Sequence, residues 1–455
     1  MADFDVMVIG GGPAGFAAAL KAAEAGAEVA LIEAERPGGA CVHYACIPTN
    51  ILLDSAINFV EARSLATLGV FDAGEQFNFG RAVARKDALV QQLFDGMATA
   101  LRTSRVKVIA GRAAFVSPSR VEVITSASTN QISAEAFVIT TGTRWEPPAI
   151  PGLDAERILT ADAIQRLTVA PKSAVVLGGG AAGTAFALEY AALLAIAGSE
   201  VAFAAPGERL VPALDADLDA TAATALTDLG VRVFYRATCV AGGPTSFTIA
   251  HKDGSLEVPG AVVVAADVRR PYFETLNLSS AGVDASGHIM VGRDCRTNVP
   301  HIFAAGDVTG GPMLASAAAQ MGEVAGANAI GGDAMTRLGA LPHILHTLPG
   351  IAWVGRTEEA ALAEGFKVTS GASDLAFNPR AIALGARSGI VKVVAERTLG
   401  EILGVHIVGP DASELIGIAA AAIQAEATLA DLASMTFSHP SMAEGLVEAA
   451  RRALR

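Results

Sequence analysis

The stretch Val6-Met-Val-Ile-Gly-Gly-Gly-Pro-Ala-Gly15 decides the fold, because it recurs as Ala174-Val-Val-Leu-Gly-Gly-Gly-Ala-Ala-Gly183. Each copy is an apolar run that enters a GxGxxG turn, followed by an alanine-rich helical stretch and a second apolar strand. In such a unit the first glycine permits the tight turn, the second lets the backbone approach a pyrophosphate, and the third lets the helix pack on the strand. One GxGxxG alone is a weak signal, whereas two copies in this context predict two dinucleotide sites on one chain.

The two copies differ at the position that reads an adenosine ribose. In the first copy, Glu33 ends the second strand, where a carboxylate can accept hydrogen bonds from the ribose. The helix of the second copy is four residues longer, and allowing for that insertion the matching position is Ala205. No arginine stands at that strand end to read a 2′-phosphate, so the usual residue does not decide between NAD and NADP.

Length and composition narrow the class of protein. At 455 residues the chain is too long for a single small core. Apolar residues make up 52% of it, but the most apolar windows are broken by Glu189, Gln424 and Glu426, so no membrane association is expected. A net charge of −13 without a basic stripe argues against nucleic acid as a partner. The start of the chain carries no secretory signal pattern, so a cytoplasmic location is expected.

Further segments fit the same plan. Residues 137–143 form a strand that runs into a turn, and the proline-rich run at 147–151 is a plausible crossover to the second nucleotide unit. Residues 302–307 end another strand with Gly-Asp, a place to hold a polar cofactor tail. From about Leu341 onward the pattern changes to short β-rich segments and then helices, which predicts a separate C-terminal domain.

Two of the four cysteines, Cys41 and Cys46, follow directly on the first nucleotide unit, in the run from Gly38 to Asn50. If a helix starts here, the two lie about a turn and a half apart, close enough to bridge if the first turn is distorted. A helix N-terminus lowers the pKa of a thiol, and the thiolate is the reactive form. This placement favours a redox pair over two buried structural cysteines, whereas the isolated Cys239 and Cys295 are expected to be inert.

Taken together, these runs resemble the flavin-dependent pyridine nucleotide-disulfide oxidoreductases, and among them most closely the dihydrolipoamide dehydrogenases. The resemblance covers essentially the whole chain. It rests on the two GxGxxG turns with Glu33, the GGxCxxxxCIPT run, the Thr-Thr-Gly142 turn, Gly306-Asp307, Thr347-Leu-Pro349, and Ser438-His-Pro-Ser-Met-Ala-Glu444. A CxxxxC run combined with an HPxxxE run nearly 400 residues away is highly specific.

The resemblance implies an α/β fold with two Rossmann-like domains that bind FAD and NAD or NADP, a central domain, and an α+β C-terminal dimerisation domain. The expected boundaries are 1–150 for the FAD-binding domain, 151–271 for the NAD(P)-binding domain, 272–340 for the central domain that completes the FAD site, and 341–455 for the interface domain. It also implies a homodimer whose active site is shared between subunits.

The same resemblance assigns catalytic residues. Cys46 would be the flavin-proximal thiol and Cys41 the interchange thiol, while His439, oriented by Glu444, would be the acid/base for Cys41 of the partner subunit. The physical case agrees, because thiol exchange requires a proton acceptor and a carboxylate partner makes a histidine more basic. His43 could tune Cys41 or simply be an exposed side chain. No metal site is expected. The implied cofactor-binding residues are Gly10, Gly12, Gly15, Glu33, Gly39, Thr141, Gly142, Gly306 and Asp307 for FAD, and Gly178, Gly180 and Gly183 for the nicotinamide nucleotide.

Three functions stay open at this point. The favoured one passes electrons from a dihydrolipoyl group on a carrier protein through the Cys41–Cys46 disulfide and FAD to NAD(P). A second is reduction of another low-molecular-weight disulfide or of mercuric ion; because no cysteine follows Cys295 in this sequence, a C-terminal cysteine shuttle is not expected. The third is a flavoprotein subunit with impaired nicotinamide binding, which the missing acid at Ala205 favours.

The sequence departs from the family at one ion pair. Where the family carries a lysine after Cys-Ile-Pro-Ser/Thr, this chain has Asn50, and where it carries the partner glutamate, this chain has Ala185. The joint absence of the lysine and the glutamate has a physical reason. Removing one partner of a buried ion pair destabilises a protein by about 3–5 kcal/mol, whereas removing both can be nearly neutral.

Without the lysine, the anionic reduced flavin and its contact with a thiolate lose stabilisation. We therefore expect a lower flavin potential and a weaker charge-transfer absorbance than in a lysine-bearing relative. The double substitution Asn50→Lys with Ala185→Glu should raise the potential, as measured by anaerobic titration against reference dyes, and an unchanged potential would contradict this account.

Overall fold

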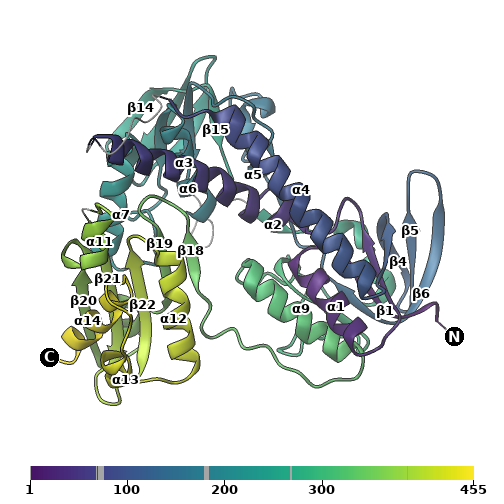
Figure 1. The fold of residues 1–455 in the computed structure, drawn as a ribbon. Coiled ribbons are helices and arrows are strands. Elements are labelled where there is room, and N and C mark those ends of the chain that lie inside the picture. The colour runs from purple at the N-terminus through teal and green to yellow at the C-terminus, as the bar shows by residue number, and fades with distance from the viewer. Residues whose placement is uncertain (1, 68, 70–75, 179–183, 267–268, 387) are drawn as a thin grey trace. The chain divides into compact units, whose positions relative to one another are not determined.

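The computed structural model describes residues 2–67, 69, 76–178, 184–266, 269–386 and 388–455 (Figure 1). They form two compact units, each assembled from three separate stretches of chain. The first unit contains the described residues up to 48, 84–146 and 269–338, and the second contains the remaining described residues. The four-domain division expected from the sequence stays a prediction. Among the described residues, none of the helices has both the length and the apolar character that a membrane span requires.

A seven-stranded sheet organises the first unit. Strands β3-β2-β1-β6 and β17 run parallel, with β17 paired to β6, and β4, β5 and the start of β6 form an antiparallel meander. The parallel strands read as continuous apolar runs because both of their faces are covered. The strands are β1 (Phe4–Ile9), β2 (Val29–Glu33), β3 (Lys107–Ala110), β4 (Arg112–Ser117), β5 (Arg120–Ile124), β6 (Thr129–Ile139) and β17 (Ile302–Ala304).

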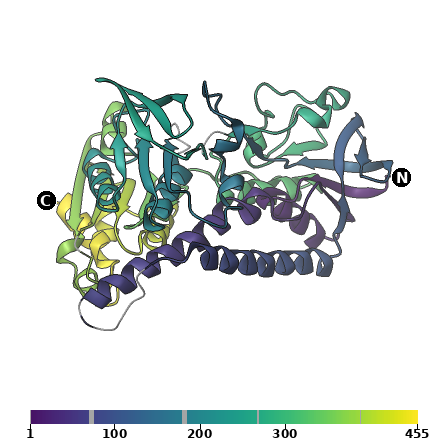
Figure 2. The same cartoon turned by 90° about the horizontal axis from the view of Figure 1, so that it is seen from above.

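Alternate residues of β1 face two different cores. Val6 and Val8 pack against helices α1 (Pro13–Glu24) and α9 (Ala315–Ala329) and the end of α4 (Phe79–Thr103), whereas Met7 and Ile9 face the β4–β5 side. Helices α1 and α9 lie closely packed side by side because the glycines of α9 sit directly on the α1 backbone. Figures 1 and 2 show β1 (purple) beside β6 (blue), with the N-terminus at the edge of this unit.

The second unit repeats the plan of the first. Its parallel sheet has the order β11-β10-β9-β15-β8, with an antiparallel meander β12-β13-β14 beside it. Helix α1 ends nine residues after Gly15 and α6 ends 13 residues after Gly183, which confirms the four-residue longer helix. The elements are β8 (Ile158–Leu159), α5 (Ala161–Ile164), β9 (Ser173–Leu177), α6 (Thr184–Ile196), β10 (Glu200–Ala204), α7 (Ala216–Asp228), β11 (Arg232–Phe234), β12 (Thr238–Gly242), β13 (Ser246–His251), β14 (Gly254–Pro259) and β15 (Val262–Val264).

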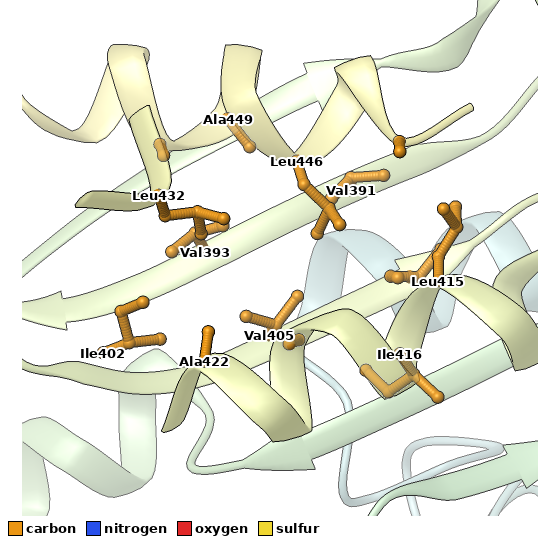
Figure 3. Packing of buried hydrophobic residues seen from close by; sticks show 14 of the residues in the cluster. Val391, Val393, Ile402, Val405, Leu415, Ile416, Ala422, Leu432, Leu446 and Ala449 are labelled. Carbon is orange, nitrogen blue, oxygen red and sulfur yellow. The ribbon is translucent and has the colours of Figure 1, made fainter. Parts of the chain in front are cut away.

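The C-terminal part of the second unit is an antiparallel sheet of order β18-β19-β22-β21-β20, as the change of pattern near Leu341 predicts. Side chains such as Val391 and Val405 face helices α12 and α14 in one apolar core (Figure 3). The elements are β18 (His343–Leu345), β19 (Ile351–Gly355), α10 (Glu358–Ala363), β20 (Val368–Asp374), α11 (Pro379–Ala383), β21 (Ile390–Glu396), β22 (Ile402–Val408), α12 (Ala412–Gln424), α13 (Leu429–Ser434) and α14 (Glu444–Ala453).

The other face of this sheet carries a cluster of charges around Lys392. Its ammonium group lies 2.9 Å from Glu358, 3.5 Å from Asp215 and 3.6 Å from Asp217, and its side chain is only 11% exposed. The Asp215 carboxylate also accepts a hydrogen bond from the Glu358 backbone at 2.9 Å. His406, the cross-strand neighbour of Lys392, is fully buried. Asp215 and Asp217 stand at the start of α7. The ammonium group of Lys392 therefore links helix α7 to the C-terminal sheet.

Replacing Lys392 by methionine should therefore destabilise the protein. The substitution keeps the apolar stem but leaves three carboxylates facing one another, and since two of them are partly exposed we expect a loss of about 1–3 kcal/mol. The measurement is the midpoint of urea unfolding, with Lys252→Met, at an exposed hairpin turn, as the matched control.

The same variant has a distinctive pH dependence. Burial opposes ionisation of Glu358, but the hydrogen bonds from Lys392 and Ser370 outweigh it and lower the pKa of that carboxyl. The stabilisation is therefore present at neutral pH and is lost as the pH falls through the lowered pKa. The difference between the wild type and Lys392→Met should shrink in acid, and a difference that grew in acid would contradict this assignment.

Candidate active site

The first glycine turn lies at the carboxyl end of β1. Gly10 has a φ of 101°, and a Cβ there would stand 2.5 Å from the Thr140 carbonyl oxygen, so this residue has to be glycine. Gly15 packs equally tightly against the Gly10 backbone. By contrast, the nearest atom to a Cβ on Gly12 would be the Gly39 Cα at 3.9 Å. The turn thus leaves its middle glycine open, as the approach of a pyrophosphate requires.

Glu33 lies beside this turn. One carboxylate oxygen accepts a hydrogen bond from the Gly11 backbone N–H at 2.6 Å, and the other accepts one from Glu35 at 2.9 Å. The side chain is half-buried at the end of β2. The backbone therefore fixes the carboxylate at the strand end, the place from which it would reach an adenosine ribose.

A third segment reaches the same sheet edge through β17. Gly306 has a φ of 78° and packs against Ala14 of α1, and Asp307 follows it. The Asp307 carboxylate lies 3.2 Å from the Arg269 guanidinium and accepts a hydrogen bond from Thr143 at 3.4 Å. Burial raises the pKa of Asp307, and Arg269 and Thr143 act against that effect.

The turn after β6 is held by a neighbouring segment. The Thr141 hydroxyl donates to the Tyr272 carbonyl, and Gly142 adopts a φ of 67°. The two-stranded ribbon of β7 (Thr143–Trp145) and β16 (Arg269–Pro271) continues from this point and carries Arg269. The structure thus gathers all of the residues expected from the sequence to contact FAD within the first unit.

The cysteine pair spans two helices instead of the single helix considered from the sequence. Cys41 lies in the short helix α2 (Gly39–His43), and Cys46 is the first residue of α3 (Cys46–Thr67). Between the helices, the backbone N–H groups of Tyr44 and Ala45 both donate to the Ala40 carbonyl, at 3.0 and 2.8 Å. This break is the distortion that two cysteines five residues apart need in order to meet.

The two sulfurs share one proton. The Cys41 thiol donates a hydrogen bond to Cys46, which raises the pKa of Cys41 and lowers that of Cys46. Burial opposes ionisation of both groups, and the nearby Arg269 cation adds to the lowering at Cys46. Cys46 is therefore the sulfur that ionises first, and its position at the start of α3 favours the anion as well.

The remaining cysteines behave as expected from the sequence. Cys239 and Cys295 are buried, with exposed fractions of 8% and 0%. Burial raises the pKa of both thiols, to about 12 for Cys295. Neither thiol is placed to react.

His43 takes neither of the two parts considered for it. Its Nε2 atom lies 3.1 Å from the backbone carbonyl oxygens of Arg36 and Pro37, and its ring lies near Phe94 of α4. Since carbonyl oxygens only accept, Nε2 carries the proton. The half-buried ring ties the loop before Cys41 to α4.

The histidine expected as the base belongs to the second unit. His439 Nδ1 lies 2.9 Å from one oxygen of Glu444, the first residue of α14, and the other oxygen accepts from the Ser441 backbone N–H at 2.9 Å. The Ser441 N–H and then His439 lower the pKa of Glu444. The carboxylate accepts, so Nδ1 carries the proton and Nε2 is left as the basic nitrogen. The side chain of His439 is 69% exposed.

Next to Asn50 in the chain, the structure shows a neutral hydrogen-bond network that no sequence pattern predicts. The hydroxyl groups of Thr49 and Tyr190 lie 2.8 Å apart, and the Gln165 amide donates to both at 3.0 Å. All three side chains are buried. Asn50 itself is half-buried, and the side chain of Ala185 lies outside the description.

Of the second glycine turn, Gly178 is described, and Gly180 and Gly183 lie outside the described residues. A Cβ on Gly178 would stand 3.1 Å from both Phe203 and Pro206, so the end of β9 approaches the end of β10 as closely as a nucleotide turn requires. Ala205 is buried, with an exposed fraction of 1%.

Comparison with known proteins agrees with this geometry. Residues 4–322 match the family model described as pyridine nucleotide-disulphide oxidoreductase, and residues 341–450 match the model of the dimerisation domain of the same family. The chain belongs to this family. As a pyridine nucleotide-disulphide oxidoreductase it is a flavin-dependent enzyme that uses FAD and NAD(P), and its dimerisation domain supports a homodimer.

Several relatives are similar over most of their length. Dihydrolipoyl dehydrogenase of Bacillus subtilis is 35% identical over 450 residues, which cover 97% of each chain. Dihydrolipoyl dehydrogenase of Halobacterium salinarum is 33% identical over 99% of this chain and 96% of that relative. Leghemoglobin reductase of Glycine max is 34% identical over 98% of this chain and 87% of that relative.

The solved structure of a flavoprotein disulfide reductase is also similar. The HOCl-induced flavoprotein disulfide reductase RclA from Escherichia coli has a TM-score of 0.86 and 26% identity, covering 98% of this chain and 99% of that one. Its Cu(II) complex has a TM-score of 0.87 at the same identity, with 99% of each chain covered. These likenesses fit a disulfide oxidoreductase and do not by themselves select the substrate.

The shared proton predicts how the reduced thiols titrate. Cys46 should be alkylated by iodoacetamide with a midpoint below the ordinary thiol range of about 8.5, and Cys41 only at higher pH. In Cys41→Ala the donor is gone, so the alkylation midpoint of Cys46 should rise toward the ordinary thiol range. Peptide mass mapping across pH provides the measurement. Cys239→Ser is the control, and identical curves for all three proteins would contradict the hydrogen bond.

Proposed function

We propose that this enzyme is a dihydrolipoamide dehydrogenase that passes electrons from a dihydrolipoyl group on a carrier protein through Cys41 and Cys46 to FAD and on to NAD(P). The observation that carries the proposal is the pair of hydrogen-bonded thiols that the break between α2 and α3 brings together, with Cys41 in α2 and Cys46 at the start of α3. Support comes from the full-length similarity to dihydrolipoyl dehydrogenases. The lipoyl-bearing partner and the cytoplasmic location are parts of the same proposal.

The exchange begins with Cys41 and Cys46 joined as a disulfide. A substrate thiol loses its proton to His439 of the partner subunit, and the thiolate attacks Cys41. A bond forms between the substrate sulfur and Cys41, and the Cys41–Cys46 bond breaks with its electron pair on Cys46. The lowered pKa makes Cys46 the better leaving group, which favours Cys41 as the interchange thiol.

The second half of the exchange returns the substrate as a disulfide. Its remaining thiol attacks the substrate sulfur that is bound to Cys41, and Cys41 leaves and takes a proton. The substrate has then lost two electrons and two protons, and the enzyme holds one thiol, one thiolate and one proton on the base. Glu444 accepts a hydrogen bond from Nδ1 of His439 and so keeps the proton of the neutral ring on that atom. Nε2 is therefore the atom that receives the proton of the substrate thiol.

When bound, FAD would supply the two-electron acceptor that links the reduced cysteine pair to NAD(P). The residues that would hold it are the turn at Gly10, Gly12 and Gly15, the carboxylate of Glu33, and Asp307 paired with Arg269. These residues fit the group, because Gly12 leaves open the approach to the turn that a pyrophosphate requires.

A second candidate is reduction of a different substrate by the same thiols. The structure that resembles this chain at 26% identity is titled a disulfide reductase, and one of its forms is a Cu(II) complex. A pair of adjacent cysteines also suits a soft metal ion. This candidate differs from the first in the direction of electron flow, which runs from NAD(P)H to the disulfide or metal ion.

An anaerobic titration separates these functions. Dihydrolipoamide should reduce the flavin, and NAD or NADP added afterwards should reoxidise it. Cys41→Ser should lose reduction by dihydrolipoamide while keeping the bound flavin, because the interchange thiol is absent. Cys295→Ser is the matched control and should behave as the wild type.

Each result has a distinct meaning. Full reduction of the Cys41→Ser flavin by dihydrolipoamide would reject the assignment of Cys41. No reduction of the wild type by dihydrolipoamide, together with rapid consumption of NADH or NADPH when Cu(II) or a small disulfide is added, would favour the second candidate. No reduction of the flavin by either nucleotide at millimolar concentration would support a flavoprotein subunit instead of a dehydrogenase.

A further inference from the structure

The neighbourhood of Ala205 contains a cation that the sequence pattern does not reveal. β10 and β11 are adjacent parallel strands, and the chain segments that leave their carboxyl ends stay in contact. The Ala205 carbonyl accepts a hydrogen bond from Ala237 at 2.8 Å, and the Gly207 carbonyl accepts one from the Arg236 backbone at 2.8 Å. Arg236 therefore lies next to the chain that leaves β10, although it is 31 residues further along the sequence.

The side chain of Arg236 is available for a ligand. It is 55% exposed, and its guanidinium pairs with Glu208, which is 69% exposed. An ion pair this exposed contributes little free energy, so an incoming anion can displace the glutamate at small cost. Arg236 has a φ of 49°, so a left-handed backbone conformation places this residue at the turn.

The other arginine in this neighbourhood is already engaged. Arg209 lies closer to Ala205 in sequence, but its guanidinium pairs with Glu359 at 2.7 Å and also donates to the Leu214 carbonyl at 3.4 Å. Its side chain is 31% exposed. Arg236 is therefore the better candidate to meet a ligand at this strand end.

The position of Ala205 decides which nucleotide suits the site. In dinucleotide-binding sheets the adenosine ribose lies at the carboxyl end of the second strand, where an acidic residue binds the 2′-hydroxyl and repels a 2′-phosphate. The methyl side chain of Ala205 neither binds the 2′-hydroxyl nor repels a 2′-phosphate. A phosphate with nearly two negative charges forms a bidentate, charge-assisted pair with a guanidinium, which is stronger than a pair with an exposed carboxylate.

We propose that Arg236 is the specificity-determining residue of the nicotinamide site. Its guanidinium breaks the ion pair with Glu208 and binds the 2′-phosphate of NADP. The enzyme then prefers NADP(H) to NAD(H). The inference rests on the use of a nicotinamide nucleotide and is independent of which dithiol or disulfide the enzyme takes.

Calorimetric titration of the oxidised, FAD-loaded enzyme with NADP⁺ and with NAD⁺ tests the proposal by binding alone. The wild type should bind NADP⁺ about tenfold or more tightly than NAD⁺. Arg236→Gln should lose that preference by weakening NADP⁺ only, and Arg236→Lys should keep part of it. Arg232→Gln, an exposed arginine at the opposite end of β11, is the matched control and should change neither affinity.

Removing the competing carboxylate provides a second variant. Glu208→Gln frees the guanidinium and should tighten NADP⁺ binding while leaving NAD⁺ unchanged. The proposal is overturned if the wild type binds NAD⁺ as tightly as NADP⁺, if Arg236→Gln weakens both nucleotides equally, or if neither nucleotide binds. Failure of dihydrolipoamide to reduce the flavin would remove the proposed substrate but would leave a selectivity that depends on Arg236 intact.

Discussion

The hydrogen bond from the Cys41 thiol to the Cys46 sulfur imposes two conditions on the rest of the structure: the two thiols must differ in pKa, and the backbone between them must bend. Two sulfurs that share one proton cannot both ionise easily, so the bond lowers the pKa of one thiol at the expense of the other. It also requires a break between two helices, because a continuous helix would hold residues five apart on different faces. The paired N–H groups that donate to Ala40 stabilise that break.

The sheet of the first unit brings the segments that surround the cysteine pair to one of its edges. Parallel strands end on the same side, so residues that follow β1, β2, β6 and β17 meet there although nearly 300 positions separate the first from the last. Arg269 arrives on the adjoining ribbon and is held by Asp307. The pairing has two effects, since Arg269 opposes the rise in the pKa of Asp307 that burial causes, and Asp307 fixes a cation near Cys46.

The parts of the molecule that the sequence predicts are those with a local or repeated signal. The first glycine turn, the strand that ends in Glu33, the longer second helix and the β-rich C-terminal part all follow from spacing and periodicity. The pair of His439 with Glu444 lies within six residues, so its geometry follows from the motif. The break between α2 and α3 was not predicted, because its backbone hydrogen bonds leave no pattern in side-chain type.

The contacts that the sequence does not predict join side chains that are distant along the chain. Lys392 meets Asp215 across 177 positions, and Thr49 meets Tyr190 across 141. No period or spacing relates such residues. Arg236 shows the same difficulty at closer range, since it is the register of β11 against β10 that puts it near Ala205. A search for an arginine at the end of β10 alone therefore misses it.

The neutral network at Thr49 gives a physical reason why the chain tolerates the loss of a buried ion pair. The Gln165 amide donates to two hydroxyl groups, and one of those hydroxyl groups donates to the other, so the three side chains are hydrogen-bonded to one another without any charge. Neutral groups that are hydrogen-bonded cost less to bury than ions. With Asn50 in place of the lysine, stabilisation of the Cys46 thiolate then depends on the Cys41 proton and on Arg269, and both lie in the first unit with the cysteines.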